Sequence, residues 1–435
     1  MTQDPTPEDP TAPDAAPDEP AEEEAPPAPL LRLREPMPPV VDTEPALAAT
    51  CAAIAAGSGP VAIDAERASG YRYTSRAYLI QLRREGSGTH LVDPVAFESM
   101  APLQEVIGDE EWILHAATQD LPCLREVGLQ PAALFDTELA GRLLGHPRVG
   151  LAALVESLLG QRMAKEHSAA DWSTRPLPQP WLEYAALDVE PLVELREILG
   201  AELVEAGKDG WAAEEFDALR GFTPTPRVDA WRRTSGVHRV RGRRPLGAVR
   251  AMWELRDQIA QERDVTPGRI LPDSAIVAAS TELPTERRDL LETQGFHGRG
   301  AERYASRWVA ALRAATEMPE DDLPSRVPRG DGPPLPRSWA DKDPVAARRL
   351  ELAKPALTAL AEQHHLPVEN LLTPDFSRRV LWAPPQTREP AALADAIDER
   401  LSGYGARSWQ RALAVPVLVE AILAADEPVA PTTPE

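Results

Sequence analysis

The chain has little cysteine, little positive charge at its start and no long apolar run, and each shortage excludes a class of protein. Cys51 and Cys123 are the only cysteines among 435 residues, too few for the disulfide framework of a small secreted protein. The N-terminus lacks the basic start and apolar stretch of a signal peptide, and no run of 18 apolar residues predicts a membrane span. We therefore expect a cytoplasmic protein that does not contact a membrane.

Positive charge is scarce overall, because 46 lysines and arginines face 69 aspartates and glutamates, for a formal net charge of −23. Such an excess of acid argues against a protein that coats nucleic acid with its whole surface. The charge is unevenly distributed, since residues 1–29 contain no lysine or arginine and are rich in proline, alanine and acid. That composition does not bury enough apolar surface to fold, and we predict a disordered acidic tail over residues 1–36.

Five side chains in three short blocks carry most of the chemical information. Asp64 and Glu66 end an apolar run, and residues two apart on a strand point to the same face. Asp120 follows a second apolar run and opens a segment with helical apolar periodicity. Tyr184 and Asp188 are four residues apart, so on a helix they stack on one face. The pattern predicts that three elements bring four carboxylates and one tyrosine together.

Four carboxylates in one place predict a site for divalent metal ions. Hard cations such as Mg²⁺ prefer oxygen ligands and are held by a few carboxylates together with substrate phosphate. One acidic pair is common in so acidic a chain, so the order and spacing of the blocks are what make the pattern specific. Asp120 lies 56 residues after Asp64, and Asp188 lies 68 residues after Asp120. We predict a carboxylate cage for two divalent ions, suited to cutting a phosphodiester bond.

The three blocks resemble the Exo I, Exo II and Exo III motifs of the DEDD exonucleases, in the subgroup with tyrosine in the third motif. Three neighbouring segments narrow the resemblance to the ribonuclease D family: Leu-Ile-Gln-Leu at 79–82, His-Ala-Ala-Thr-Gln-Asp-Leu at 115–121 and Ala-Asp-Trp-Ser-Thr-Arg-Pro-Leu at 170–177. The likeness covers most of residues 40–215. One departure is Ala65, where threonine is frequent in that family.

The resemblance implies a 3′→5′ exoribonuclease that releases nucleoside 5′-monophosphates with two Mg²⁺ or Mn²⁺ ions. Asp64, Glu66 and Asp188 are then expected to hold the ion that binds the attacking water, and Asp64 to bridge to a second ion that Asp120 positions. Tyr184 is expected to hydrogen-bond the attacking water. The implied partner is RNA with a free 3′ end, such as a tRNA precursor, and no obligate protein partner is evident.

The order of apolar patterns up to residue 220 predicts an α/β ribonuclease H-like exonuclease core, a mixed sheet flanked by helices, over residues 37–220. Gly86-Ser87-Gly88 predicts the turn between the second and third strands. The expected strands are 60–65, 77–83, 88–92, 112–115 and a short one ending at 135–136, and the expected helices are 97–107, 120–127, 137–144, 150–159 and 181–206.

Two features of this core have more than one explanation. Asp136 either touches substrate or caps the helix that begins at 137, and the cap is the favoured interpretation. In the loop before the third block, Trp172 anchors the loop to the core while Asp171 and Arg175 hydrogen-bond it in place. A supporting role for these residues at the mouth of the site is the alternative.

Beyond residue 220 the sequence becomes basic. Residues 227–250 hold eight arginines against one acid, Asp229. Arginine suits phosphate contacts because its fork pairs phosphate oxygens bidentately, whereas a solvated linker is the alternative explanation. We assign residues 221–244 as a basic linker. Its candidates for nucleic-acid binding are Arg232, Arg233, Arg239, Arg241, Arg243 and Arg244.

The rest of the chain predicts two all-α modules. Residues 245–320 resemble an HRDC domain, with Pro267-Gly-Arg-Ile-Leu-Pro-Asp273 as its core motif. A Pro- and Gly-rich linker (321–340) leads to a second HRDC-like helical domain (341–427), where Asn370-Leu-Leu372 stands in place of Arg269-Ile-Leu271. A disordered tail (428–435) is expected at the end.

Two other functions fit the same residues. One is a DNA-directed 3′→5′ exonuclease on the same fold, because the acidic motifs do not read the sugar and RNA is distinguished by contacts to its 2′-hydroxyl. The other is a catalytically inactive RNA-binding scaffold, against which the four intact acids argue.

Overall fold

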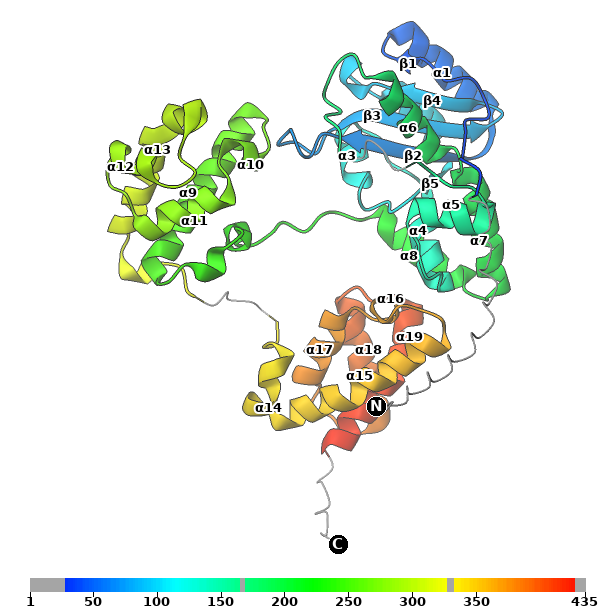
Figure 1. Cartoon of the computed structure of the whole chain (residues 1–435). Helices are drawn as coiled ribbons and strands as arrows, with labels where there is room; N and C mark the ends of the chain where they lie inside the picture. Colours follow the sequence, from blue (N-terminus) through cyan, green and yellow to red (C-terminus); the bar gives the residue numbers. More distant parts are fainter. Residues whose placement is uncertain (1–27, 165–168, 327–331, 427–435) are drawn as a thin grey trace, which may run out of the picture.

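The computed structural model describes residues 28–164, 169–326 and 332–426, which form an α/β domain followed by two helical bundles (Figure 1). This arrangement confirms the predicted fold class. The predictions for residues 1–27 of the acidic tail and for the C-terminal tail lie outside the described residues.

A six-stranded mixed sheet forms the centre of the α/β domain, in the order β1-β4-β3-β2-β5-β6. β2, β3 and β4 pair antiparallel, whereas β5 and β6 continue the sheet in parallel beyond β2 and β1 pairs parallel with β4. Gly86 and Gly88 have φ angles of 77° and 78°, which allow the predicted tight turn between β3 and β4. The strands are β1 (Val40–Val41), β2 (Ser58–Arg67), β3 (Ala77–Glu85), β4 (Gly88–Val92), β5 (Glu111–Leu114) and β6 (Ala133–Asp136).

The helices of this domain include two that the sequence did not predict, α1 and α8. The helix expected over 181–206 is two helices, because Pro191 lacks the amide hydrogen that an uninterrupted helix needs at that point. The helices are α1 (Glu44–Ala56), α2 (Ala101–Ile107), α3 (Leu121–Glu126), α4 (Thr137–Leu144), α5 (Leu151–Leu159), α6 (Gln179–Val189), α7 (Leu192–Glu205) and α8 (Asp209–Arg220).

The two helical bundles repeat one order of elements, a long helix, a single turn, two shorter helices and another long helix. A residue with positive φ follows the long first helix within two positions in each case, Asp264 at 46° and His365 at 51°, which lie 101 positions apart. The first bundle contains α9 (Arg243–Arg263), α10 (Pro267–Ile270), α11 (Asp273–Glu282), α12 (Arg287–Glu292) and α13 (Gly298–Glu317). The second contains α15 (Pro344–Gln363), α16 (Val368–Leu371), α17 (Pro374–Trp382), α18 (Pro390–Gly403) and α19 (Ser408–Asp426), preceded by α14 (Trp339–Lys342).

The first bundle docks on the loop that follows β2 through polar groups. Asp264 Oδ1 accepts hydrogen bonds from the amides of Tyr73 and Thr74, each 3.1 Å long, and from the Thr74 hydroxyl at 3.0 Å. The Tyr73 hydroxyl donates to Asp257 Oδ2 at 3.0 Å, and the Arg269 guanidinium lies 4.1 Å from the centre of a tyrosine ring in the same loop. The bundle's own apolar core is separate from that of the α/β domain.

The second bundle shares one apolar core with the α/β domain. Trp211 of α8 stacks on Trp409 of α19, with ring centroids 4.6 Å apart and planes 11° apart. Beside the rings, the Lys208 amine donates to the carbonyl oxygens of Leu143 at 2.5 Å and His364 at 2.7 Å. This contact is therefore built like the interior of a domain.

The predicted tail and linkers are wider than the structure allows. Leu31 is buried against the α/β domain, so residues 28–36 are an ordered part of it. Trp231 and Val240 lie in the core of the first bundle, and Trp339 is fully buried in the core of the second. Parts of the predicted linkers 221–244 and 321–340 therefore belong to the bundles, because apolar side chains within them are buried in the bundle cores.

Among the described residues, α19 is the one helix long and apolar enough to cross a membrane by length and composition, which corrects the prediction that no segment passes this test. The helix packs on α15 and α18, and its Leu418 and Ile422 are fully buried. A core helix of a bundle passes the same test for the same reason, a large buried apolar face.

Candidate active site

Three carboxylates meet beside the central strand of the sheet. Asp64 and Glu66 come from β2, where the buried Ala65 between them faces the opposite way, and Asp188 comes from α6, which packs across β2, β3 and β4. One oxygen from each carboxylate lies within 4.8 Å of the other two. The three side chains can thus ligate one hard cation, as their sequence positions predicted.

Asp120 lies at the edge of this triad rather than within it. It precedes the first residue of α3, is 4% exposed, and shares a hydrogen bond with Asp64. Its Oδ1 lies 3.7 Å from Nη2 of Arg67. The structure therefore places all four predicted acids together, with Asp120 held between Asp64 and a positive charge.

Tyr184 lies one helical turn before Asp188 on α6, as its spacing predicted. Its hydroxyl hydrogen-bonds the Asp188 carboxylate, and burial followed by the nearby negative charges raises the pKa of the phenol. Tyr184 thus remains protonated at neutral pH and keeps a hydrogen to donate.

Burial raises the pKa of every acid in the group, and repulsion by neighbouring carboxylates raises the pKa values of Glu66, Asp120 and Asp188 further. The pKa of Glu66 rises to about 10, first through loss of hydration and then through the charges of Asp64, Asp188 and Asp120. Loss of hydration is also the first cause of the raised pKa values of the other three carboxyls. Acids that repel one another in a buried, all-oxygen site fit divalent cations, which remove the repulsion when they bind.

Arg67 is the residue of this site that the sequence interpretation missed. It lines the same cavity of about 270 Å³ as the four acids and Tyr184, and a neighbouring cavity of about 290 Å³ that leads toward Gly70 and Ala170. Its side chain is 28% exposed and its charge lowers the pKa of Asp64, Glu66 and Asp120. The available signal was its position, directly after Glu66 at the end of a strand whose other charged residues are Asp64 and Glu66.

Hydrogen bonds to the Asp136 carboxylate fix the turn that precedes Asp120. The Asp136 carboxylate accepts from the amides of Ala116 at 3.2 Å, Ala117 at 2.8 Å and Leu139 at 3.0 Å, so it caps α4, the favoured interpretation, and also fixes the turn. Ala116 has a φ of 59°, a left-handed conformation that a residue with a Cβ adopts at a cost. Nearby, burial lowers the pKa of His115 to about 4, so this ring is neutral at physiological pH.

The loop before the third motif is anchored as the sequence suggested. Trp172 is fully buried, and Asp171 accepts from the amide of Ser173 at 3.2 Å. Arg175 donates to both oxygens of Asp93, at 2.6 and 2.8 Å. Through Ser173, whose hydroxyl accepts from Arg72 at 2.9 Å, this loop also contacts the segment on which the first bundle docks.

The six arginines proposed for nucleic acid divide into two groups. One group is occupied within the first bundle, where its guanidiniums donate to main-chain carbonyls between residues 316 and 325; these are Arg232, Arg243 and Arg244. The other group is exposed on the surface of that bundle; these are Arg233, Arg239 and Arg241. These hydrogen bonds correct the assignment of the first group to a linker, because the three side chains join the start of the bundle to its end, and nucleic-acid binding by all six arginines stays a prediction.

Comparison with protein families matches three parts of the chain. Residues 38–204 match a family described as 3′→5′ exonuclease, residues 246–312 match the HRDC domain, and residues 332–422 match a family described as the 3′→5′ exonuclease C-terminal domain. Enzymes of the exonuclease fold depend on divalent metal ions, in agreement with the acidic cluster.

Whole-chain comparisons agree with this division. The chain is 31% identical over 344 residues to ribonuclease D of Granulibacter bethesdensis, covering 77% of this chain and 84% of that protein. It is 29% identical over 294 residues to ribonuclease D of Escherichia coli, covering 66% and 76%.

Solved structures extend the likeness to the arrangement of the domains. A crystal structure of a protein from Bifidobacterium adolescentis is 36% identical, with a TM-score of 0.83, over 91% of this chain and 99% of that one. Escherichia coli RNase D, described as an exoribonuclease involved in structured RNA processing, is 26% identical with a TM-score of 0.61, over 84% and 99%.

Proposed function

Because the chain belongs to the ribonuclease D family of 3′→5′ exoribonucleases, we propose that it trims the 3′ ends of structured RNAs such as tRNA precursors, releasing nucleoside 5′-monophosphates with two divalent cations. The observation that carries the proposal is the triad of Asp64, Glu66 and Asp188 with the Tyr184 hydroxyl on its edge. The structured substrate follows from the description of the E. coli relative.

In this proposal Asp64, Glu66 and Asp188 hold one ion, and Asp64 together with Asp120 holds the other. Bound divalent ions stabilise negative charge on the attacking and leaving oxygens of a phosphodiester. The Mg²⁺ or Mn²⁺ preference does not follow from the ligands, since carboxylate oxygens suit both ions.

The chain's own groups position the reactants. When Asp188 ligates an ion, the Tyr184 hydroxyl would turn its one hydrogen from that carboxylate to the attacking water and aim the water at the scissile phosphorus. Arg67 leaves Asp120 and pairs with a phosphate oxygen of the RNA strand, for which its place between the two cavities is suited. The neutral His115 and the Asp136 carboxylate keep the Asp120 turn in place.

The test is a time course with RNA and DNA oligomers labelled at either end, in Mg²⁺, Mn²⁺ or chelator. We expect 3′-labelled RNA to release labelled mononucleotide at once, 5′-labelled RNA to shorten step by step, and chelator to stop both. Asp188→Asn serves as the inactive control and should lose at least about a thousandfold, which corresponds to about 4 kcal/mol of transition-state stabilisation. Equal rates on DNA would favour the DNA-directed alternative, and shortening from the 5′ end would overturn the proposal.

A second measurement separates the two positioning residues. Tyr184→Phe should lower kcat with little change in RNA affinity, because an orienting hydrogen bond acts mainly in the transition state. Arg67→Gln should mainly raise KM and change kcat less, because its proposed phosphate contact exists already in the bound substrate. The exposed Arg288→Gln removes one positive charge on the first bundle and is the control for net charge.

A further inference from the structure

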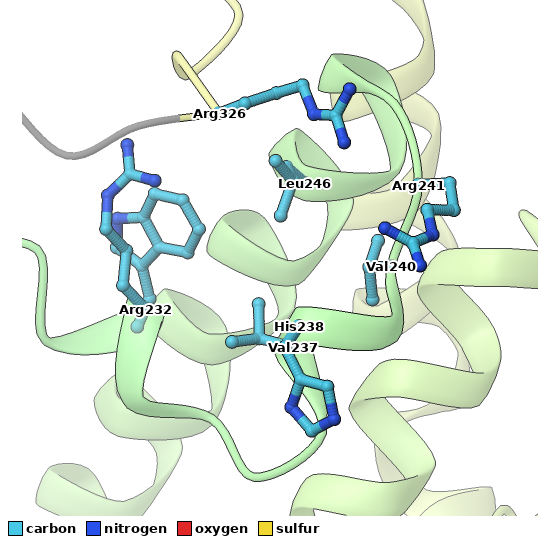
Figure 2. A pocket seen from close by; sticks show the side chains of 8 residues that line it. Arg232, Val237, His238, Val240, Arg241, Leu246 and Arg326 are labelled. Atoms are coloured by element: carbon cyan, nitrogen blue, oxygen red, sulfur yellow. The ribbon is translucent and has the colours of Figure 1, made fainter. Parts of the chain in front are cut away.

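The first bundle contains a cavity of about 210 Å³ at the place where its two ends come together (Figure 2). Its floor is apolar and includes Val240 and Leu246, and three arginines surround it: Arg232, Arg241 and Arg326. The cavity belongs to the helical module and not to the α/β domain that holds the acidic site.

The walls of the cavity are built into the bundle. Trp231 is 3% exposed, and its indole donates to Asp229 at 3.1 Å. The Arg232 guanidinium lies 4.3 Å from the centre of that ring and donates to the Ser325 carbonyl at 3.0 Å, so one side chain ties the start of the module to its end. Because Ser325 is held in this way, Arg326 is placed at the rim of the cavity rather than on a free segment.

The positive charge at this cavity is only partly balanced. Asp229 lies 2.8 Å from Arg232, whereas Arg241 and Arg326 are exposed, and none of the described residues that line the cavity is acidic. Two guanidiniums on one rim match the oxygens of a phosphate, which they pair in fork geometry.

The size and floor of the cavity suit part of a nucleotide. Pockets for drug-sized ligands are typically about 300–1,000 Å³, so a cavity of about 210 Å³ takes a smaller group. The Trp231 ring is covered by the Arg232 guanidinium, so a base would pack on the aliphatic floor and against the guanidinium plane, which stacks on aromatic faces. The adjoining phosphate then lies within reach of the exposed arginines.

From this geometry we propose that the cavity is a binding site for one nucleoside phosphate unit, its phosphate between Arg241 and Arg326 and its base on the apolar floor. The proposal rests on the proposed function, in which RNA is the substrate, and adds a second holding point outside the active site. The unit comes either from the RNA strand or from a free nucleoside 5′-monophosphate released by the reaction, and the experiment distinguishes these sources.

The test uses the full chain with both rim charges removed, Arg241→Gln with Arg326→Gln. The matched control removes two exposed arginines elsewhere on the same bundle, Arg288→Gln with Arg303→Gln. Dissociation constants for a fluorescent single-stranded RNA are measured by anisotropy in chelator, where hydrolysis stops, over a series of salt concentrations. Thermal unfolding of both variants establishes that they remain folded.

We expect the rim variant to bind RNA about tenfold more weakly, the loss that follows from a charge-assisted hydrogen bond of roughly 1.5 kcal/mol. Its plot of log Kd against log salt should also be flatter by about 0.7 for each phosphate that an arginine no longer pairs. At saturating RNA with metal, kcat should be unchanged. Equal affinities and slopes for the rim and control variants would overturn the proposal, whether both variants bind like the unmutated chain or both bind more weakly.

A calorimetric titration with 5′-AMP identifies the source of the unit. If 5′-AMP binds the unmutated chain but not the rim variant, the site takes free product as well as the RNA strand. If the rim charges affect RNA binding but 5′-AMP does not bind, the site takes the strand alone. Failure of the proposed function is recognised separately, since the unmutated chain would then leave RNA intact whatever the cavity binds.

Discussion

The first helical bundle meets the α/β domain through hydrogen bonds, whereas the second meets it through stacked tryptophans and a shared apolar core. Both use the same corner of the bundle, the turn after the long first helix. Asp264 stands there in the first bundle, and in the second the His365 carbonyl lies so close to Gly145 that a Cβ on that glycine would be 2.5 Å from it. The contact of the first bundle is thus polar and partly open to solvent, whereas that of the second is part of a domain core.

The two bundles share one order of helices, so their different attachment to the α/β domain comes from the chemistry of a few contact residues and not from their fold. Polar contacts exchange with water at little net cost, since a typical hydrogen bond contributes about 1 kcal/mol. Trp409 is buried and the half-buried Trp211 packs on the shared core, so separating the two rings exposes apolar surface to water. Four measurements test whether the two bundles differ in this way.

The largest effect is expected from Trp409→Ala. It removes a buried ring that stacks on Trp211, and such changes cost about 3–5 kcal/mol. We expect urea unfolding of the α/β domain and the second bundle to shift together as one transition. The matched change in the first bundle, Trp308→Ala, should leave that transition in place. Separate transitions for the second bundle and the α/β domain would contradict the shared core.

Removal of the metal ions should lower the stability of the α/β domain together with the second bundle and leave that of the first bundle unchanged. An ion at a hundred times its Kd stabilises the folded state by about 2.7 kcal/mol. In chelator, the folded pKa of Glu66 near 10 lies above its ordinary value of 4.5, so its contribution favours folding at low pH and is lost as pH rises toward 10. Calorimetry should therefore show a larger effect of Mg²⁺ on Tm at pH 9 than at pH 6. A Tm that changes equally with Mg²⁺ for the first bundle would contradict this.

A smaller loss of unfolding free energy is expected from Lys208→Met. The amine satisfies the carbonyls of Leu143 and His364, and leaving buried acceptors unpaired costs about 1–3 kcal/mol. The check is the free energy of unfolding from urea titration, with Lys354→Met, an exposed lysine of α15, as control. A loss no larger than that of the control would show that water replaces the amine.

The smallest change in stability is expected from Asp264→Asn, which weakens three hydrogen bonds but suits the positive φ at this position. We expect a change in unfolding free energy below about 1 kcal/mol but faster proteolysis within residues 221–229. Small-angle scattering should show a larger radius. An unchanged proteolysis rate would show that the bundle is held by more than this contact.

The carboxylate site was predictable because it depends on local periodicity. Asp64 and Glu66 share a strand face, Tyr184 and Asp188 share a helix face, and these rules hold whatever surrounds them. The repeated order of helices was visible for a similar reason, since a short motif forms a single turn after the long first helix of both bundles. Only the first bundle matches the HRDC family, whereas the second matches the 3′→5′ exonuclease C-terminal domain, so a second HRDC copy stays a prediction.

The rest depends on contacts between distant parts of the chain. Arg232 and Ser325 are 93 positions apart, and no local pattern shows that their hydrogen bond turns a basic segment into part of a bundle. The role of Arg67 likewise becomes visible only when Asp120, from another strand-to-helix turn, is placed beside it. The helix α1 was missed because its alanine-rich sequence has no clear apolar periodicity.

The extended segment 221–229 joins α8 to the first bundle (Figure 1). A short tether holds its two ends at an effective concentration in the millimolar range. A docking contact too weak to detect between separate molecules therefore remains mostly closed within one chain. Mixing the isolated first bundle with the rest of the protein would miss the Asp264 contact, although the intact chain maintains it.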